Sequence, residues 1–269
     1  MPFLAVTPAP PLDALIETIW DWDMPMPSHH FDRILALPHP TIIINLADDS
    51  TRVYADEQGN GCRTASSSTF SGPYTHSFVI DALEQVRVMG VVFRPGCASA
   101  FMHHSIDSLS NADTDLVDLF GPDALRLRQQ LLEASLPTHR TALLEQWLCS
   151  NLIATPDPLV MYALDTLARA PQTSRIDALT ADCGVSPRRL GNLFRQHVGM
   201  TPKRYARLLR FQAVVADAHH RRHINWARVA VDGGFHDQAH LSHEFRTFSG
   251  MSPGTWLARR GPHINHVPP

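Results

Sequence analysis

The sequence predicts an α+β protein, with a small amino-terminal β-barrel or sandwich followed by helices, and an all-α carboxy-terminal part. Three observations support this prediction. Short apolar runs between Phe31 and Phe93 are separated by turn residues, as in small barrels and sandwiches. Helical periodicity replaces them from Ala98 onward. One helical pattern then occurs twice between Arg175 and Arg260.

Charge is divided unequally between these two parts. Residues 174–269 contain 14 Lys+Arg and 6 Asp+Glu, a net of +8, whereas residues 1–173 carry a net of −11. The net charge of the whole chain, −3, hides this difference. A basic half beside an acidic half is typical of a protein in which one part binds nucleic acid.

The 269 residues, 44% of them hydrophobic, are enough for two packed domains. We expect a first domain at 1–170, a linker at 171–174, a second domain at 175–260 and a tail at 261–269. The four cysteines lack metal-binding spacing, and we find no leader peptide or membrane-spanning run. These features predict reduced thiols in a cytoplasmic protein without a membrane partner.

Local patterns suggest the elements of the first domain. Residues 1–11 are proline-rich and predict an extended segment, and Leu12–Trp20 fits a short helix or a strand. Thr41–Leu46 is a β-branched run that we expect to be a strand buried on both faces. The turn after it predicts a hairpin to a strand at Arg52–Tyr54. Further strands are expected at His76–Ile80 and Gln85–Phe93.

Five helices are expected after these strands, at Ala98–His104, Asp115–Phe120, Pro122–Ser135, His139–Ile153 and Pro158–Ala170. The helix at His139–Ile153 has an apolar stripe formed by Leu143, Leu144, Trp147 and Leu148. Such a stripe fits either a homodimer interface or packing against the β-structure of the same chain.

The first copy of the repeated pattern extends from Leu179 to Tyr205 and is typical of a helix-turn-helix. Gly184 permits the positive φ that ends a helix in a sharp turn. Ser186 is a candidate N-cap, and Pro187 suits the first helical position. Residues with helical spacing then face inward, at Leu190, Leu193, Phe194 and Val198. The outer face keeps Arg188, Arg189, Asn192, Arg195 and Gln196, side chains that suit base edges and phosphates in a major groove.

The second copy, Val229 to Trp256, has the same organisation. Gly233-Gly234 makes the turn and Asp237 is the candidate N-cap. Pro202–His219 reads as one long helix between the copies, which can hold the two motifs in successive major grooves, roughly 34 Å apart. A plain helical bundle also uses glycine turns and caps, but it has no need to duplicate the pattern.

Residues 175–260 resemble the double helix-turn-helix domain of the AraC family of bacterial transcription regulators. The matching residues of the first copy are Leu179, Ala181, Gly184, Ser186, Leu190, Phe194, Gly199 and Pro202. Those of the second are Ala230, Gly234-Phe235, Asp237, His240-Leu241, Phe245-Arg246, Gly250 and Pro253.

This resemblance implies which side chains contact double-stranded operator DNA. The family's base-reading positions fall on Arg188, Gly191, Asn192, Gln238, Ala239 and His243. Gly191 has no side chain to read a base with, and His243 stands where the family often has arginine. We expect Ser186, Arg189, Arg195, Lys203 and Arg246 to hold phosphates, which positions a protein on DNA without selecting sequence.

The first domain more weakly resembles an uncharacterised amino-terminal domain found in AraC-type regulators. The similarity lies in Phe70–Tyr74, Met89–Cys97 and Leu116–Gly121. It implies a sensor domain with a small-molecule effector and, by analogy only, a cupin-like barrel. The family also implies RNA polymerase as a partner.

The alternative from another class is a cupin-like metal-dependent enzyme with a helical accessory domain. His236, His240 and His243 have a spacing that could bind a metal, but they lie within the second helix-turn-helix. We find no strand with a His-x-His pair and no phosphate-binding loop or nucleophile motif. We therefore expect no cofactor, no metal and no catalytic residues.

Overall fold

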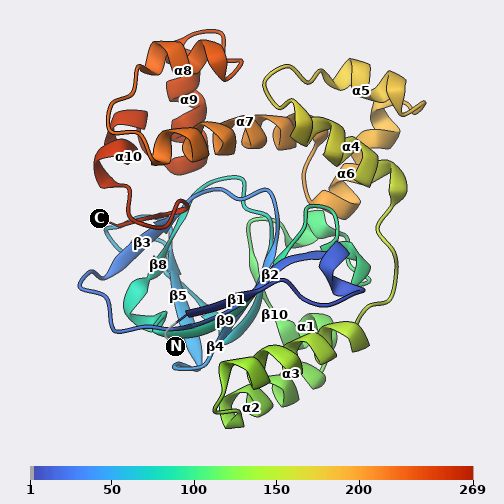
Figure 1. The fold of residues 1–269 in the computed structure, drawn as a ribbon, viewed down its shortest axis with the longest axis vertical. Coiled ribbons are helices and arrows are strands. Elements are labelled where there is room, and N and C mark those ends of the chain that lie inside the picture. Colours follow the sequence, from blue (N-terminus) through green and yellow to red (C-terminus); the bar gives the residue numbers. More distant parts are fainter. Residues whose placement is uncertain (1–2, 269) are drawn as a thin grey trace.

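Two antiparallel sheets form a sandwich in the amino-terminal part of the computed structural model, which describes residues 3–268 (Figure 1). Residues 1, 2 and 269, at the ends of the predicted first domain and tail, lie outside the described residues. The first sheet has the order β1 (Phe3–Val6), β2 (Ile16–Asp23), β9 (Arg87–Phe93), β4 (Thr41–Asn45), β7 (Ser68–Ser71) and β10 (Asp113–Asp115).

The second sheet has the order β11 (His266–Val267), β3 (Phe31–Ile34), β8 (Phe78–Asp81), β5 (Ser50–Tyr54) and β6 (Arg63–Ser66). No described strand is hydrogen-bonded into both sheets, so the fold is the predicted sandwich and not a closed, cupin-like barrel. The last strand comes from the carboxy-terminal tail, where Val267 pairs with Arg33.

The predicted hairpin between Thr41–Leu46 and Arg52–Tyr54 is wrong, because β4 and β5 belong to different sheets. The chain leaves β4 at Asn45, whose side-chain Oδ1 accepts hydrogen bonds from the N–H groups of Ala47 and Asp48 at 2.8 and 2.9 Å. This Asx-type turn carries the chain across the sandwich. The expectation that this strand is buried on both faces is also too strong, since Ile43 is only half-buried.

Helices follow the sandwich largely as predicted, at α1 (Leu116–Phe120), α2 (Asp123–Glu133), α3 (Pro137–Ser150) and α4 (Pro158–Arg169). The predicted helix at Ala98–His104 is wrong beyond one 3-10 turn, η3 (Ala98–Ala100). Phe101 and Met102, which follow it, are buried in the core of the sandwich. Tertiary burial overrides the local helical preference here.

The apolar stripe of α3 packs within the chain. Leu144 and Leu148 are fully buried in the core of the sandwich, and Arg140 donates to the buried carboxylate of Asp21 in β2 at 2.7 Å. Of the two predicted uses of this stripe, packing on the same chain is the one observed.

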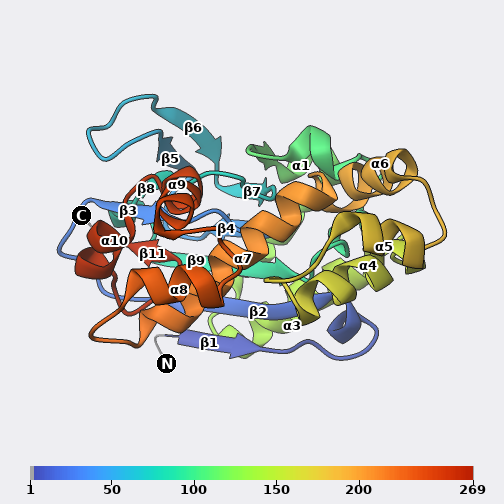
Figure 2. The same cartoon turned by 90° about the horizontal axis from the view of Figure 1, so that it is seen from above.

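The carboxy-terminal part consists of α5 (Ile176–Asp182), α6 (Pro187–Val198), α7 (Pro202–His219), α8 (Trp226–Asp232), α9 (Gln238–Ser249) and α10 (Pro253–Arg259). The long α7 lies across the top of the sandwich, with α5 and α6 toward one of its ends and α8 and α9 toward the other (Figures 1 and 2). Buried residues of α4 also belong to the apolar core of this part. Among residues 3–268, no helix has the length and apolarity needed to cross a bilayer.

Candidate nucleic-acid interface

The first helix-turn-helix consists of α5, a tight turn and α6. Gly184 in the turn has φ +63°, and the N–H of Val185 reaches back to the carbonyl of Thr180 at 3.2 Å. Ser186 caps α6 by accepting a hydrogen bond from the N–H of Arg189 at 3.2 Å. Turn and cap are therefore the ones predicted from the sequence, and they fix the direction in which α6 leaves α5.

The two faces of α6 differ sharply in burial. Leu190, Phe194 and Val198 are buried in the helical core, whereas Arg188, Arg189, Asn192 and Arg195 are exposed. Within the described chain, none of these three arginines has an ion-pair partner, and Arg195 Nη1 donates to Asn192 Oδ1 at 3.3 Å. The exposed face thus presents free bidentate donors.

The second helix-turn-helix repeats this arrangement with α8 and α9. Gly234 has φ +72°, and Asp237 caps α9 by accepting from the N–H of His240 at 2.7 Å. This hydrogen bond, followed by one from His236, lowers the pKa of the Asp237 carboxyl, so the cap stays ionised at neutral pH. The exposed side chains of α9 are Gln238, Ala239, His243 and Arg246.

An acidic residue that we did not single out from the sequence fixes α9 to α7. The buried carboxylate of Glu244 accepts hydrogen bonds from Nε and Nη2 of Arg207 at 2.8 and 2.7 Å. The only sequence signal was a single acid in an otherwise basic helix. Lys203 lies exposed at the start of α7, on the side of the first motif.

The structure thus gathers the predicted contact residues in two exposed groups, joined by α7. Ser186, Arg188, Arg189, Asn192, Arg195 and Lys203 belong to the first motif, and Gln238, Ala239, His243 and Arg246 to the second. Gly191 lies in the middle of α6 without a side chain, with only Arg195 Nη1 near an added Cβ, at 3.9 Å.

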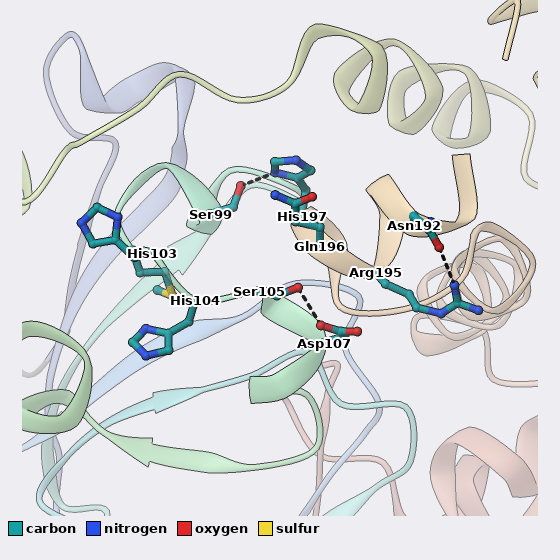
Figure 3. A pocket seen from close by; sticks show the side chains of 10 residues that line it. Ser99, His103, His104, Ser105, Asp107, Asn192, Arg195, Gln196 and His197 are labelled. Carbon is teal, nitrogen blue, oxygen red and sulfur yellow. Dashed lines mark hydrogen bonds between the residues drawn. The ribbon is translucent and has the colours of Figure 1, made fainter. Parts of the chain in front are cut away.

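The carboxy-terminal end of α6 docks onto the amino-terminal part. The His197 ring Nδ1 and the Ser99 hydroxyl form a hydrogen bond of 2.9 Å (Figure 3). Ser110 donates to the carbonyl of Gly199 at 2.8 Å, and Arg204 Nη2 donates to the carbonyl of Thr75 at 3.1 Å. Burial lowers the pKa of His197, only partly offset by Asp157, so this imidazole is neutral at pH 7.

The end of α9, together with α7 and α10, also contacts loops of the amino-terminal part that adjoin the second sheet. The N–H of Ala36 donates to the carbonyl of Phe248 at 3.1 Å, and Gln212 in α7 donates to the carbonyl of Ala36 at 2.5 Å. Glu57 accepts from Arg259 at 2.8 Å and from Arg33 at 2.9 Å. No local sequence pattern could have revealed these contacts, because their partners are far apart in the chain.

His236 and His240, at the start of α9, contribute to the local structure around the N-cap. The N–H of His236 donates to the ring of His240 at 3.2 Å, and that ring packs edge-on against Phe235. Within residues 3–268, no group of three or more His, Cys, Asp or Glu side chains has an arrangement that could hold a metal ion.

Two family models match the chain. Residues 179–259 match a family described as "Helix-turn-helix domain", and residues 4–115 match "Domain of unknown function (DUF6597)". A search among curated proteins gave no significant match.

Solved structures with the same organisation include ToxT from Vibrio cholerae in its P21 form. It is 8% identical to this chain with a TM-score of 0.50, and the alignment covers 96% of this chain and 98% of ToxT. At this identity the likeness concerns the fold alone.

Two other matches cover less than half of this chain. The C-terminal domain of AraT from Geobacillus stearothermophilus is 18% identical, with a TM-score of 0.37, over 40% of this chain and 89% of its own. An AraC-type regulator from Chromobacterium violaceum is 23% identical, with a TM-score of 0.36, and the alignment covers 39% of this chain and 94% of that regulator.

Proposed function

We propose that this chain, whose residues 179–259 match a helix-turn-helix domain family, is a transcription regulator of the AraC type that binds a specific DNA sequence and responds to an effector. One observation carries the proposal. Two recognition helices, α6 and α9, are capped alike, buried on one face, and expose donor-rich faces free of competing ion pairs among the described residues.

Different roles are proposed for the exposed side chains of these helices. Arg188, Asn192, Gln238, Ala239 and His243 read bases, because they lie in the first two turns of their helices, the part that enters a major groove. The DNA phosphates on either side of these bases are held by Ser186, Arg189, Arg195, Lys203 and Arg246. Ala239 contributes only an apolar contact, of the kind that a thymine methyl group accepts.

The effector and the protein partners are proposed on the strength of the family. The amino-terminal sandwich acts as the sensor, and RNA polymerase is the partner in transcription. The cytoplasm is the proposed location. The proposed homodimer uses a surface other than the apolar stripe of α3, because Leu144 and Leu148 of that stripe are buried within the chain. The division of the chain at 170–175 stays a prediction.

Neither family model supports the alternative of a cupin-like metal-dependent enzyme. The observed sandwich also lacks the closed barrel on which that alternative was based.

The decisive experiment selects bound DNA from a random pool with the full-length protein. We expect one enriched site with two recognition elements about one helical turn apart, because α6 and α9 flank α7. Arg126→Ala, at an exposed position of α2 in the amino-terminal part, should return the same site. Failure to enrich any sequence, or binding that does not weaken with added salt, would contradict the proposed function.

A further inference from the structure

A groove separates α6 from the loop that follows η3 in the amino-terminal part. One hollow of about 420 Å³ lies between Ser99–Asp107 and the second half of α6. A second hollow of about 310 Å³ adjoins it at the start of α7. Arg195 and Asp107 line both hollows, so the two form one continuous groove between the domains.

The lining of this groove is rich in hydrogen-bond donors that lack partners. His103 and His104 line the larger hollow from the amino-terminal part, and Gln196 and His197 line it from α6. In Figure 3 both imidazole rings extend away from α6, at the open side of the hollow. Within residues 3–268, the side chains of His103, His104 and Gln196 form no hydrogen bond or ion pair. In the second hollow, Nε of Arg204 is buried without a partner.

Negative charge is scarce in the same place. Asp107 is the single acid that lines either hollow, and its carboxylate already accepts the hydroxyl of Ser105 at 2.6 Å. The second hollow also meets the amino-terminal end of α7, an 18-residue helix, where backbone dipoles favour anions. Two arginines from the helix-turn-helix domain, Arg195 and Arg204, therefore line hollows that contain a single acid.

Other classes of ligand fit less well. Met102 is the only apolar side chain in the larger hollow, so a hydrocarbon ligand would find no cluster of apolar side chains to pack against. The described histidines and acids offer no arrangement for a metal ion. A DNA duplex is too wide to enter a hollow of this volume.

Arg195 connects the groove to the proposed DNA interface. Its guanidinium is exposed and lies at the rim, with a single long hydrogen bond of 3.3 Å to Asn192. In Figure 3 it points toward Asn192 and away from the imidazoles. A side chain held this weakly can turn either into the groove or outward to a DNA phosphate, but not to both at once.

We propose that the groove binds a small polar molecule with two or more anionic groups, a di- or tricarboxylate or a sugar phosphate, and that this ligand competes with DNA for Arg195. The ligand spans both domains, so it also holds α6 against the sandwich. The competition rests on the proposed function, whereas the binding site does not.

The test uses the full-length protein and two probes, citrate and glucose 6-phosphate, with glucose as the neutral control. Calorimetric titration measures probe binding without DNA. Fluorescence anisotropy measures binding of the selected DNA at constant ionic strength, which separates competition from salt screening. We expect saturable binding of at least one anion, no binding of glucose, and a rise of about tenfold in the Kd for DNA when the site is filled.

A double variant, His103→Ala with His104→Ala, identifies the site. It should weaken anion binding about tenfold, and the Kd for DNA without ligand should stay within about twofold of the wild type. The matched control is His139→Ala, an exposed histidine on α3 outside the groove. Arg204→Gln should weaken anion binding to the same extent as the double variant, because Arg204 lines the second hollow.

Several outcomes would overturn the proposal: neither anion binds, glucose binds equally well, the double variant binds the anion like the wild type, or a bound anion leaves the Kd for DNA unchanged. Binding of citrate alone or of glucose 6-phosphate alone would identify the carboxylate or the phosphate as the recognised group. Anion binding through these histidines in a protein that binds no DNA would sustain the site and contradict the proposed function.

Discussion

Arg188 and Arg195, both on α6, have the same side chain but different surroundings. Arg188 lies in the first turn of α6, exposed and without an ion pair among the described residues. Arg195 lies two turns later, at the groove between the domains. The same residue type therefore has two proposed roles on one helix: Arg188 lies in the part that enters a major groove, and Arg195 lies beyond that part, where backbone contacts are expected.

We predict that Arg188→Ala relaxes the preference at one base pair by about 1–3 kcal/mol. Arg195→Ala should instead weaken binding to all sequences alike and lower the salt dependence by about one released counterion. Gel-shift titrations across operator variants and salt concentrations distinguish the two. Identical behaviour of both variants would show that the roles are wrongly assigned.

Two glycines of the first motif share a left-handed backbone but have different neighbours. Gly184 has φ +63° and open space around an added Cβ, whereas at Gly199, φ +81°, that Cβ would lie 2.4 Å from the hydroxyl of Ser110 and 2.7 Å from Pro73. Gly184→Ala should cost about 1–2 kcal/mol from backbone strain alone. Gly199→Ala should cost about 1–3 kcal/mol more, because its neighbours must move. Equal losses in urea denaturation would mean that α6 does not dock on the sandwich in solution.

At the scale of elements, the orientation of α9 depends on its ion pair with α7. Burial pushes the pKa of Glu244 upward, but the hydrogen bonds and charge of Arg207, helped by His240 and Arg210, bring it below its ordinary value. A carboxyl whose pKa is lowered in the folded state stabilises the fold above its unfolded pKa. That stabilisation disappears as the pH falls through the folded value.

We predict that Glu244→Gln lowers the free energy of unfolding by about 1–3 kcal/mol at neutral pH, because two charge-assisted hydrogen bonds are weakened. The difference from the wild type should shrink as the pH falls below 4.5, the ordinary pKa of a glutamate side chain. Denaturation curves at neutral and acidic pH measure this difference in the free energy of unfolding. Asp232→Asn, in an exposed pair with Arg228, is the control and should show no measurable loss. A constant difference between Glu244→Gln and the wild type at all pH values would contradict the ion pair.

At the scale of the whole molecule, the two parts share one apolar cluster. Leu35 and Ala36, from the segment after β3, are fully buried among residues of the helical part. The tail returns to add β11 to the second sheet. The helix-turn-helix domain is thus held to the sandwich by packing, by backbone pairing and by the contacts of α6 and α9.

We predict that Leu35→Ala costs about 2–5 kcal/mol and raises hydrogen–deuterium exchange in α7 and α9, although the residue belongs to the amino-terminal part. Met26→Ala, at a side chain that is 68% exposed, should change neither. Increased exchange confined to the sandwich would show that the two parts do not share a core.

The sequence alone was sufficient for the double helix-turn-helix, because its information is local. Glycines at the turns, caps at Ser186 and Asp237 and apolar residues at helical spacing act within a few residues of one another, and duplication doubled the signal. These patterns also placed the candidate contact residues on the exposed faces of α6 and α9, where the structure has them.

Only the tertiary structure decided what depends on distant partners. It placed β4 and β5 in two different sheets and buried the segment after Ala98 in the core instead of forming the predicted helix. It also brought His103 and His104 into the lining of one hollow together with α6. Strand pairing and domain docking are set by burial and by contacts between residues far apart in the chain. No local pattern records them, so the groove beside Arg195 could only be found in three dimensions.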